Sequence, residues 1–265
     1  MRTWSEVETD SGFWAGVASA PAVVLVLDYD GTLAPFVANP AEAVPYPGVC
    51  EAVTRLMDGE RCRVVFVTGR AIDDLLPLLA LPRTPEIWGS HGGERLLSDG
   101  RCIPPAMQDE TREALARAAG MANAAGYSHN LERKPGCIAF HLRSLPEQER
   151  AKASEWARGA WGELDGRDGL VLHAFDGGLE LRCAGFGKDR AVRTIVEEAP
   201  DGAAIFYLGD DLTDEDAFAA LAGHGTGIIV RAQCERPSLA QWILHPPMEL
   251  IAFFQRLTDV LVGRT

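Results

Sequence analysis

The sequence predicts an α/β fold in which a Rossmann-like core, with a parallel sheet and helices on both faces, carries an inserted α+β domain. Four short apolar runs are rich in β-branched residues and do not alternate with polar ones, as is typical of strands that are buried on both faces. Helical patterns separate these runs, and β-α-β alternation implies parallel strands with right-handed crossovers. The four runs are AVVLVL (22–27), RVVFV (63–67), AAIFYL (203–208) and GIIV (227–230).

The predicted helices follow from apolar residues at helical spacing and from the residues that begin and end each pattern. The first begins at a Pro-Gly pair and ends at Gly59, and the second starts directly after the second strand. The tail, residues 241–257, is predicted to be a short strand followed by a helix. The remaining predicted helices span residues 47–59, 69–80, 187–199 and 212–223.

The alternation of buried strands and helices is interrupted in the middle of the chain. Its strand CIAFHLR (137–143) alternates apolar and polar side chains, which indicates a sheet with one face on helices and the other toward water or a ligand. We therefore assign residues 104–184 to an inserted α+β domain, and residues 1–103 and 185–265 to the core. The other predicted elements of the insertion are helices over 109–125 and 147–161 and strands over 170–175 and 179–183.

Charge and composition exclude several classes of protein. Asp and Glu number 38 and Lys and Arg 25, so the net charge of −13 argues against a nucleic-acid partner. No apolar run approaches the roughly 18 residues of a membrane span, and the acidic N-terminal stretch lacks the features of a signal peptide. The six cysteines form no C-x-x-C pair, so we expect reduced thiols in a cytoplasmic protein without a membrane partner.

Reactive side chains follow three of the four buried runs, in LDYDGT, VTGR and LGDDLTDED. If these strands are parallel, their carboxyl ends meet at one edge of the sheet, where ligands bind in such folds. Clustered carboxylates repel one another unless a divalent cation offsets their charge, and Mg²⁺ prefers oxygen ligands. The residues expected at this edge are Asp28, Asp30, Asp210, Asp211 and Asp214, with Thr68 and Arg70 nearby.

These residue types suit phosphoryl transfer. A carboxylate can attack phosphorus and a second can act as general acid and then base. Asp28 and Asp30 are two residues apart, so on an extended strand both would face one substrate, and Gly31 would permit a tight turn. Thr68 at a helix start and Lys188 at another could bind the phosphoryl oxygens. Each motif alone has an ordinary structural explanation, such as a turn or a solvated acidic helix start; their joint order favours a catalytic site.

The motifs together resemble those of the haloacid dehalogenase (HAD) superfamily of phosphatases: DYDGTL, VTGR, Lys188 and GDDLTDED. The resemblance implies that Asp28 is the nucleophile and Asp30 the acid and base. It also implies that Thr68, Gly69 and Lys188 bind the phosphoryl group, and that the insertion is a mobile cap. The implied Mg²⁺ ligands are Asp28, the Asp30 backbone carbonyl and Asp210, with Asp211 and Asp214 holding metal-bound waters or neighbouring groups.

Further segments are similar to trehalose-6-phosphate phosphatases: SHGGERL (90–96), LERKPGCIAFHLR (131–143), LELR (179–182) and GDDLTDEDAF (209–218). Two positions depart from that pattern, since Cys183 stands where the family often has Pro and Asp189 where it often has Gly. The substrate-binding residues that this resemblance implies are Arg70, His91, Gly92, Glu94, Glu132, Lys134, His141, Arg143, Glu180 and Arg182.

The insertion residues also make physical sense for a disaccharide phosphate, whose hydroxyls need several charged hydrogen-bonding partners. We expect His141 and Arg143 to share one face of one strand, and Glu180 and Arg182 to share a face of another. The alternative is that they are ordinary polar residues on the solvated face of a sheet.

The resemblance thus implies an enzyme that hydrolyses trehalose 6-phosphate with Mg²⁺, through an aspartyl-phosphate, in the last step of trehalose biosynthesis. A functional link to a trehalose-6-phosphate synthase would follow. Two alternatives remain open: a phosphatase for another sugar phosphate, such as sucrose phosphate or a glycosyl-phosphoglycerate, and a non-catalytic domain that binds sugar phosphates.

Overall fold

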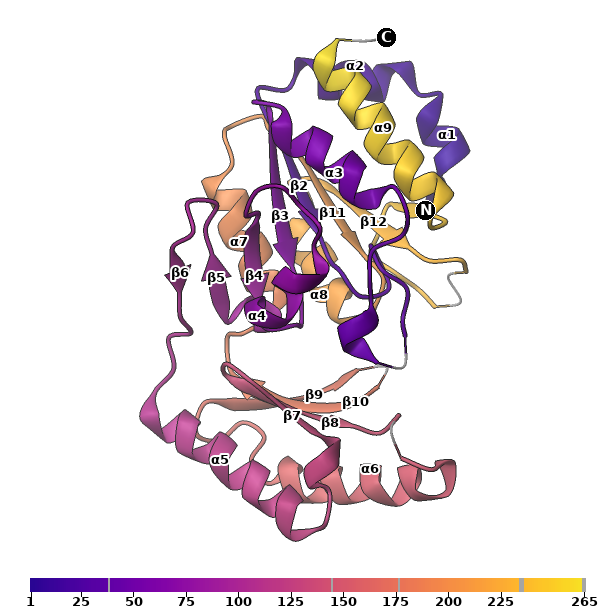
Figure 1. The fold of residues 1–265 in the computed structure, drawn as a ribbon. Helices are drawn as coiled ribbons and strands as arrows, with labels where there is room; N and C mark the ends of the chain where they lie inside the picture. The colour runs from indigo at the N-terminus through magenta and orange to yellow at the C-terminus, as the bar shows by residue number, and fades with distance from the viewer. Residues whose placement is uncertain (38, 144, 176, 234–235, 264–265) are drawn as a thin grey trace. The chain divides into compact units, whose positions relative to one another are not determined.

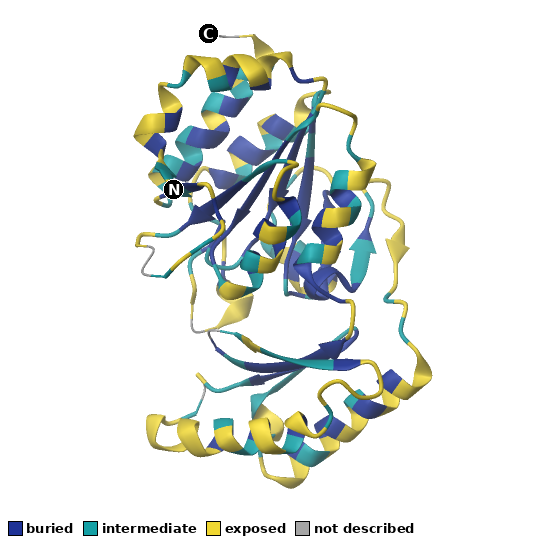
Figure 2. Ribbon diagram, turned by 180° about the vertical axis from the view of Figure 1, so that it is seen from behind, coloured by how far each residue is buried: buried dark blue, intermediate teal, exposed yellow. Residues whose placement is uncertain are grey.

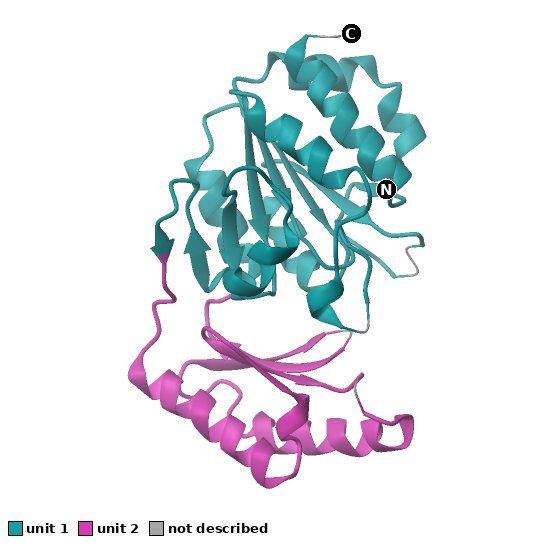
Figure 3. Cartoon of the chain, viewed as in Figure 1, with its two compact units in different colours: residues 1–102, 187–265 teal, residues 103–186 magenta. Residues whose placement is uncertain are grey.

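The computed structural model describes all residues except 38, 144, 176, 234–235 and 264–265, so one of the six cysteines, Cys234, lies outside the described residues. The chain forms two compact units (Figure 3). Unit 1 comprises residues 1–102 and 187–265, and unit 2 comprises residues 103–186. The predicted insertion, 104–184, falls within the range of unit 2, and its action as a cap stays a prediction.

Unit 1 contains a large mixed sheet with the strand order β1-β13-β12-β11-β2-β3-β4-β5-β6 among the described residues. The strands from β1 to β4 in this order are parallel, and β5 is antiparallel to β4. This confirms the predicted α/β class. The strands span Arg2–Thr3 (β1), Val23–Leu27 (β2), Cys62–Val67 (β3), Glu86–Gly89 (β4), Glu94–Leu96 (β5), Cys102–Ile103 (β6), Ala204–Gly209 (β11), Thr226–Val230 (β12) and Trp242–Leu244 (β13).

Helices cover both faces of this sheet (Figure 1). Alternate residues of β2 point to opposite sides: Leu25 packs with α1, α2, α3 and α9, whereas Val26 packs with α7 and α8. The central strands are therefore buried throughout (Figure 2), which explains their unbroken apolar sequence. The helices span Trp4–Glu8 (α1), Ser11–Ser19 (α2), Val49–Asp58 (α3), Lys188–Glu198 (α7), Leu212–Leu221 (α8) and Met248–Val262 (α9).

The predicted helix over residues 69–80 is wrong in extent. The structure has a single α-helical turn, α4 (Ile72–Leu75), followed by a 3-10 turn over Leu76–Leu78. Pro77 has no backbone N–H and its ring crowds the preceding turn, so the α-helix cannot continue through it. Residues 69–71 remain a loop, which matters because this loop follows β3 directly into the candidate site.

The described residues of unit 2 form a four-stranded antiparallel sheet, in the order β7-β8-β10-β9, with two helices packed on one face. Ile138 and Phe140 face α5 and α6 in a core with Trp161, as the alternating pattern predicts. One expectation is wrong: β8 ends at His141, so Arg143 lies beyond the strand and does not share its face by strand geometry. The elements span Asp109–Ala124 (α5), Leu131–Lys134 (β7), Cys137–His141 (β8), Glu147–Gly162 (α6), Leu170–Phe175 (β9) and Gly178–Cys183 (β10).

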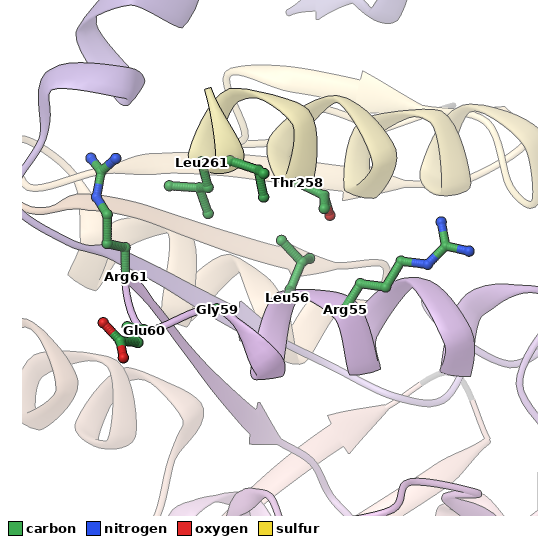
Figure 4. A pocket seen from close by; sticks show the side chains of 8 residues that line it. Arg55, Leu56, Gly59, Glu60, Arg61, Thr258 and Leu261 are labelled. Atoms are coloured by element: carbon green, nitrogen blue, oxygen red, sulfur yellow. The ribbon is translucent and has the colours of Figure 1, made fainter. Parts of the chain in front are cut away.

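A hollow of about 220 Å³ lies where α3 and α9 end (Figure 4). Leu56, Thr258 and Leu261 line it, beside the segment Gly59–Arg61 that leads into β3. It therefore lies at the end of β3 opposite to Thr68, away from the clustered carboxylates. No described helix has the length and apolar character needed to cross a lipid bilayer.

Candidate functional site

The parallel register of unit 1 brings the predicted strand ends together. β2 pairs with β11 on one side and with β3 on the other, and the Asp28 N–H continues the first ladder by donating to the Leu208 carbonyl (2.9 Å). Asp28 follows β2, Thr68 follows β3 and Asp210 follows β11. The carboxyl ends of parallel strands share one edge of a sheet, so the three reactive segments meet as expected.

A buried lysine joins two of the carboxylates. Lys188, the first residue of α7, donates from Nζ to Asp28 Oδ1 (2.6 Å) and to Asp214 Oδ1 (2.7 Å). All three side chains are at most 4% exposed. The second oxygen of Asp28 accepts a hydrogen bond from the Thr32 hydroxyl (3.0 Å). Burial would lower the pKa of Lys188, but the adjacent carboxylates raise it, so the ammonium group keeps its charge.

Asp214 has both oxygens occupied by protein groups. Oδ1 also accepts from the Tyr207 hydroxyl (2.6 Å), and Oδ2 accepts from the backbone N–H groups of Asp210 (3.0 Å) and Asp211 (2.9 Å). Burial opposes ionisation, but Lys188 and these hydrogen bonds outweigh it and hold the pKa of Asp214 below its usual range. The side chain therefore fixes the loop after β11 and orients Lys188, in line with the prediction that it holds neighbouring groups.

Asp210 is differently placed. Oxygens of Asp28, Asp210 and Asp214 lie within 4.8 Å of one another, and Asp210 Oδ1 has no hydrogen-bond partner among the described residues. Burial and then the neighbouring carboxylates raise the pKa of Asp210 to about 9 and that of Asp28 to about 7. A bound cation would offset this repulsion and give the buried oxygen a ligand partner, so the cluster fits a metal ion with oxygen ligands.

The turn after Asp28 needs glycine. Gly31 has a φ of +84°, and a Cβ there would lie 2.2 Å from Asp210 Oδ2. β2 ends at Leu27, so the expectation that Asp28 and Asp30 belong to the extended strand is wrong, whereas the expectation that both face one substrate stays a prediction. The segment after Leu27 instead curves toward the loop after β11, which is how the Asp210 carboxylate comes so close.

Asp30 is held by an arginine from the next strand end. The Arg70 guanidinium donates twice to its carboxylate, from Nε (2.7 Å) and Nη2 (2.6 Å), and lies 5.4 Å from the centre of the Tyr29 ring. A two-point contact of this kind fixes orientation as well as distance. Arg70 was expected to bind substrate; in this structure its guanidinium instead pairs with Asp30, the residue predicted to act as acid and base.

Thr68 and Gly69 lie in the loop between β3 and α4. The first helical residue is Ile72, so the expectation that Thr68 begins a helix is wrong. Its hydroxyl accepts a hydrogen bond from the Arg70 N–H (3.1 Å), which shapes the loop. The predicted substrate residues His91, Gly92 and Glu94 lie beside this loop in unit 1, and Glu94 Oε1 is engaged by the Ile72 N–H (3.0 Å) and the Ser90 hydroxyl (2.9 Å).

Unit 2 gathers a second polar group on the sheet face opposite its helices. Glu132 accepts from Lys134 (3.1 Å) and from His141 Nε2 (2.7 Å). Burial would raise the pKa of Glu132, but the His141 hydrogen bond and the Lys134 charge lower it to about 2. On β10, Glu180 and Arg182 lie on the same face, as expected, with Oε1 and Nη1 3.9 Å apart.

Three described residues that lie beside these groups were not predicted. Thr32 hydrogen-bonds Asp28, and its place within DYDGTL was the available signal. Tyr207 contacts Asp214 from the middle of β11, where an apolar run gave no sign of it. His173 lies on β9 directly opposite Glu180 of β10, a pairing that only the strand register reveals.

Comparisons with known proteins agree with this architecture. The family model described as trehalose-phosphatase matches residues 26–247. Trehalose-phosphate phosphatases from Mycobacterium marinum and Mycobacterium avium are 30% and 32% identical over 92% and 91% of this chain, which spans 63% of the length of each.

Among solved structures, a trehalose-6-phosphate phosphatase C-terminal domain of C. albicans has a TM-score of 0.76 at 19% identity, covering 95% of this chain and 98% of that one. A phosphatase of the haloalkanoate (HAD) superfamily from Bacteroides thetaiotaomicron has a TM-score of 0.58 at 17% identity, covering 93% and 97% of the two chains. At these identities the structures establish the fold, and they confirm the predicted HAD-like class.

Proposed function

The chain belongs to the trehalose-phosphatase family, and on that premise we propose that it is a Mg²⁺-dependent phosphatase that converts trehalose 6-phosphate to trehalose and phosphate. The observation that carries the proposal is the environment of Asp28, a buried carboxylate held by Lys188 and Thr32. It lies beside an Asp210 oxygen that has no hydrogen-bond partner among the described residues. We further propose that it acts in the cytoplasm at the last step of trehalose biosynthesis, after a trehalose-6-phosphate synthase.

Two half-reactions are proposed. In the first, an Asp28 oxygen attacks phosphorus, the bond from phosphorus to the sugar oxygen breaks, and Asp30 gives a proton to that oxygen. In the second, Asp30 takes a proton from water, which attacks the aspartyl-phosphate and releases phosphate and free Asp28. We propose that Arg70 orients the Asp30 carboxylate and releases one of its oxygens when Asp30 carries the proton. We propose that Lys188 and the Thr68 loop bind the phosphoryl oxygens.

The metal would be held by Asp28, Asp210 and the Asp30 backbone carbonyl. Bound there, Mg²⁺ would offset the clustered negative charge of protein and phosphate. Asp211 lies next to this group and keeps its predicted role of holding metal-bound water. Asp214 is excluded as a direct ligand in this proposal because protein groups already occupy both of its oxygens.

Mg²⁺ is expected to raise the midpoint of thermal unfolding (Tm) of the wild-type chain, because it binds only the folded carboxylate cluster. At a concentration of about 100 times Kd the gain is about 2.7 kcal/mol. Asp210→Asn should abolish the rise, and Asp216→Asn on the exposed side of α8 should keep it. Differential scanning calorimetry with Mg²⁺ and with chelator measures both; an unchanged rise in Asp210→Asn would exclude Asp210 as a ligand.

Recognition of the sugar is proposed for unit 2, through Glu132, Lys134, His141, Arg143, Glu180 and Arg182. Carboxylates and cations that are already hydrogen-bonded to one another on one sheet face can redistribute those bonds to sugar hydroxyls. Glu132 and Glu180 lie on either side of Ala139 in the strand register, so their carboxylates belong to the same face of the sheet.

The test is phosphate release from trehalose 6-phosphate, sucrose 6-phosphate, glucosyl-3-phosphoglycerate and p-nitrophenyl phosphate. Wild type should prefer trehalose 6-phosphate, and Glu180→Gln should lower kcat/KM for it by about 10²-fold, because a site built to bind a hydroxyl loses that interaction. Turnover of p-nitrophenyl phosphate, which carries no sugar, should change little.

Glu155→Gln, an exposed carboxylate of α6, is the matched control and should behave as wild type. A clear wild-type preference for another sugar phosphate would exclude trehalose 6-phosphate as the substrate and leave the phosphatase chemistry in place. Absence of hydrolysis with all four esters in Mg²⁺ would instead favour a binding domain without catalysis.

A further inference from the structure

Residues Ser90–Glu94, here named the 90–94 turn, have an unusual backbone. Ser90 and His91 are consecutive non-glycine residues with positive φ values of 49° and 56°, and both residues are at least nine-tenths buried. Left-handed conformations are costly for such residues and persist only where surrounding contacts determine them. The contacts of this turn therefore indicate what the conformation serves.

One set of contacts reaches the loop after β3. The Ser90 N–H donates to the Arg70 carbonyl (2.7 Å), and the His91 N–H donates to the Thr68 carbonyl (2.9 Å). The His91 ring lies against Gly69, where an added Cβ would come within 2.7 Å of the ring. The turn thus fixes the backbone on both sides of Gly69 and leaves no room for a side chain there.

A second contact reaches the start of α7. Gly92 has a φ of +85°, and a Cβ at this position would lie 2.9 Å from the carbonyl oxygen of Gly187 and 3.4 Å from the Ala191 Cβ. Gly187 immediately precedes Lys188. Because the obstructing atom is a backbone oxygen, a side chain at position 92 must shift either the 90–94 turn or the first turn of α7, and either shift changes the distance between the Thr68 loop and Lys188.

Glu94 fixes the turn at its far end. Its Oε1 accepts from the Ser90 hydroxyl (2.9 Å) and from the Ile72 N–H at the start of α4 (3.0 Å). One carboxylate oxygen therefore connects the strained residue to the helix that ends the Thr68 loop. This is the contact pattern of a residue that holds other groups in place.

We propose that the 90–94 turn is a positioning element that sets the spacing between the Thr68 loop and Lys188, the two groups that bind the phosphoryl oxygens. The proposal rests on the proposed function for the role of those two groups. In this proposal Gly92 and Glu94 affect phosphate binding by holding the Thr68 loop and Lys188 in position, and they do not contact the sugar. Small displacements of binding groups have large effects on phosphoryl transfer.

The first test compares two glycines with nearly the same backbone. Gly92→Ala should weaken binding of inorganic phosphate to the Mg²⁺-loaded chain about tenfold or more, as measured by isothermal titration calorimetry. Gly100→Ala imposes a similar strain, at a φ of +86°, but nothing lies within 4 Å of its Cβ, so binding should stay within about twofold of wild type. An equal loss in both variants, or in neither, would overturn the proposal.

A second pair remains informative even if Gly92→Ala does not fold. Glu94→Gln keeps an oxygen that can accept both hydrogen bonds and should bind phosphate as wild type does; Glu94→Ala should bind it about tenfold more weakly. Both are measured well below their Tm. Equal phosphate affinity in the two variants would contradict the positioning role, since a merely stabilising residue would change Tm alone.

The readout also separates this inference from the proposed function. If wild type binds phosphate and the variants behave as described, the positioning role holds even where trehalose 6-phosphate is not hydrolysed. If trehalose 6-phosphate is hydrolysed but Gly92→Ala and Glu94→Ala bind phosphate normally, the positioning role alone fails.

Discussion

Asp28→Asn is expected to lower kcat for trehalose 6-phosphate by about 10⁴-fold or more, since loss of a nucleophile leaves only the catalysis that binding and charge provide. Asn has nearly the same shape and keeps one oxygen that can accept a hydrogen bond, so the Lys188 and Thr32 side chains retain a neighbour of the same size. Phosphate release at saturating substrate, with Mg²⁺, measures the loss.

Asp216→Asn on the exposed side of α8 serves as the control for the same chemical change. Circular dichroism and Tm establish that Asp28→Asn is folded. If the folded variant keeps a tenth or more of wild-type turnover, Asp28 is not the nucleophile and the carboxylate that attacks phosphorus must be sought elsewhere in the cluster.

Lys188→Met is expected to have the second largest effect, on both activity and stability. The substitution leaves Asp28 and Asp214 buried without the cation that each contacts within 2.7 Å. Breaking a buried ion pair by removing one partner costs about 3–5 kcal/mol of the free energy of unfolding. Loss of the charge that would bind phosphoryl oxygens should lower kcat/KM by about 10²–10³-fold.

The double variant Lys188→Met/Asp214→Asn separates these two effects. Removing the Asp214 charge should restore part of the stability, because one of the two uncompensated carboxylates is gone. Activity should not recover, because the Lys188 ammonium group is still absent from beside Asp28. Urea unfolding and phosphate release measure the two quantities, and a single variant as stable as wild type would show that the ion pair contributes nothing to the fold.

The stabilisation by this pair should also depend on pH in a defined direction. The pKa of Asp214 is lowered in the folded chain, so its contribution is present above the unfolded pKa of about 4 and is lost as the pH falls. The pKa of Lys188 is raised, so its contribution is present below the unfolded pKa of about 10.4 and is lost only above that. Lys188 also lowers the pKa of Asp28, which is about 7 in the folded chain, so its removal raises that pKa further. The destabilisation in Lys188→Met, measured by urea unfolding, should therefore grow as the pH rises from about 5 to 9.

The sequence was sufficient to predict the meeting of Asp28, Thr68 and Asp210. Unbroken β-branched runs imply parallel strands that are buried on both faces, and parallel strands end at one edge. That inference needed no distances. The sequence did not show where each strand ends. Asp28 and Asp30 lie beyond β2, and Arg143 lies beyond β8. The two-residue period of a strand therefore could not predict which way these side chains face.

Other features depend on contacts between distant segments and leave no mark in a local pattern. The Arg70–Asp30 pair joins residues 40 positions apart, and the Gly92–Gly187 approach joins the turn between β4 and β5 to the connection between β10 and α7. The four-residue strand β4 was not among the predicted strands, because it begins with a glutamate, Glu86. This glutamate is buried and forms ion pairs with Arg63 and Arg95. A buried charged residue of this kind looks like a surface residue in the sequence, and its place in a strand is recognised only when its ion-pair partners are known.

The central claim is that trehalose 6-phosphate transfers its phosphoryl group to Asp28. Rapid acid quenching of the full chain with Mg²⁺ and trehalose 6-phosphate carrying radioactive phosphate, followed by peptide mapping, tests it most directly. We expect a hydroxylamine-sensitive label on the peptide that contains Asp28, and no such label in Asp28→Asn. Release of phosphate by wild type with no label on that peptide at any time, or with label on another residue, would contradict it.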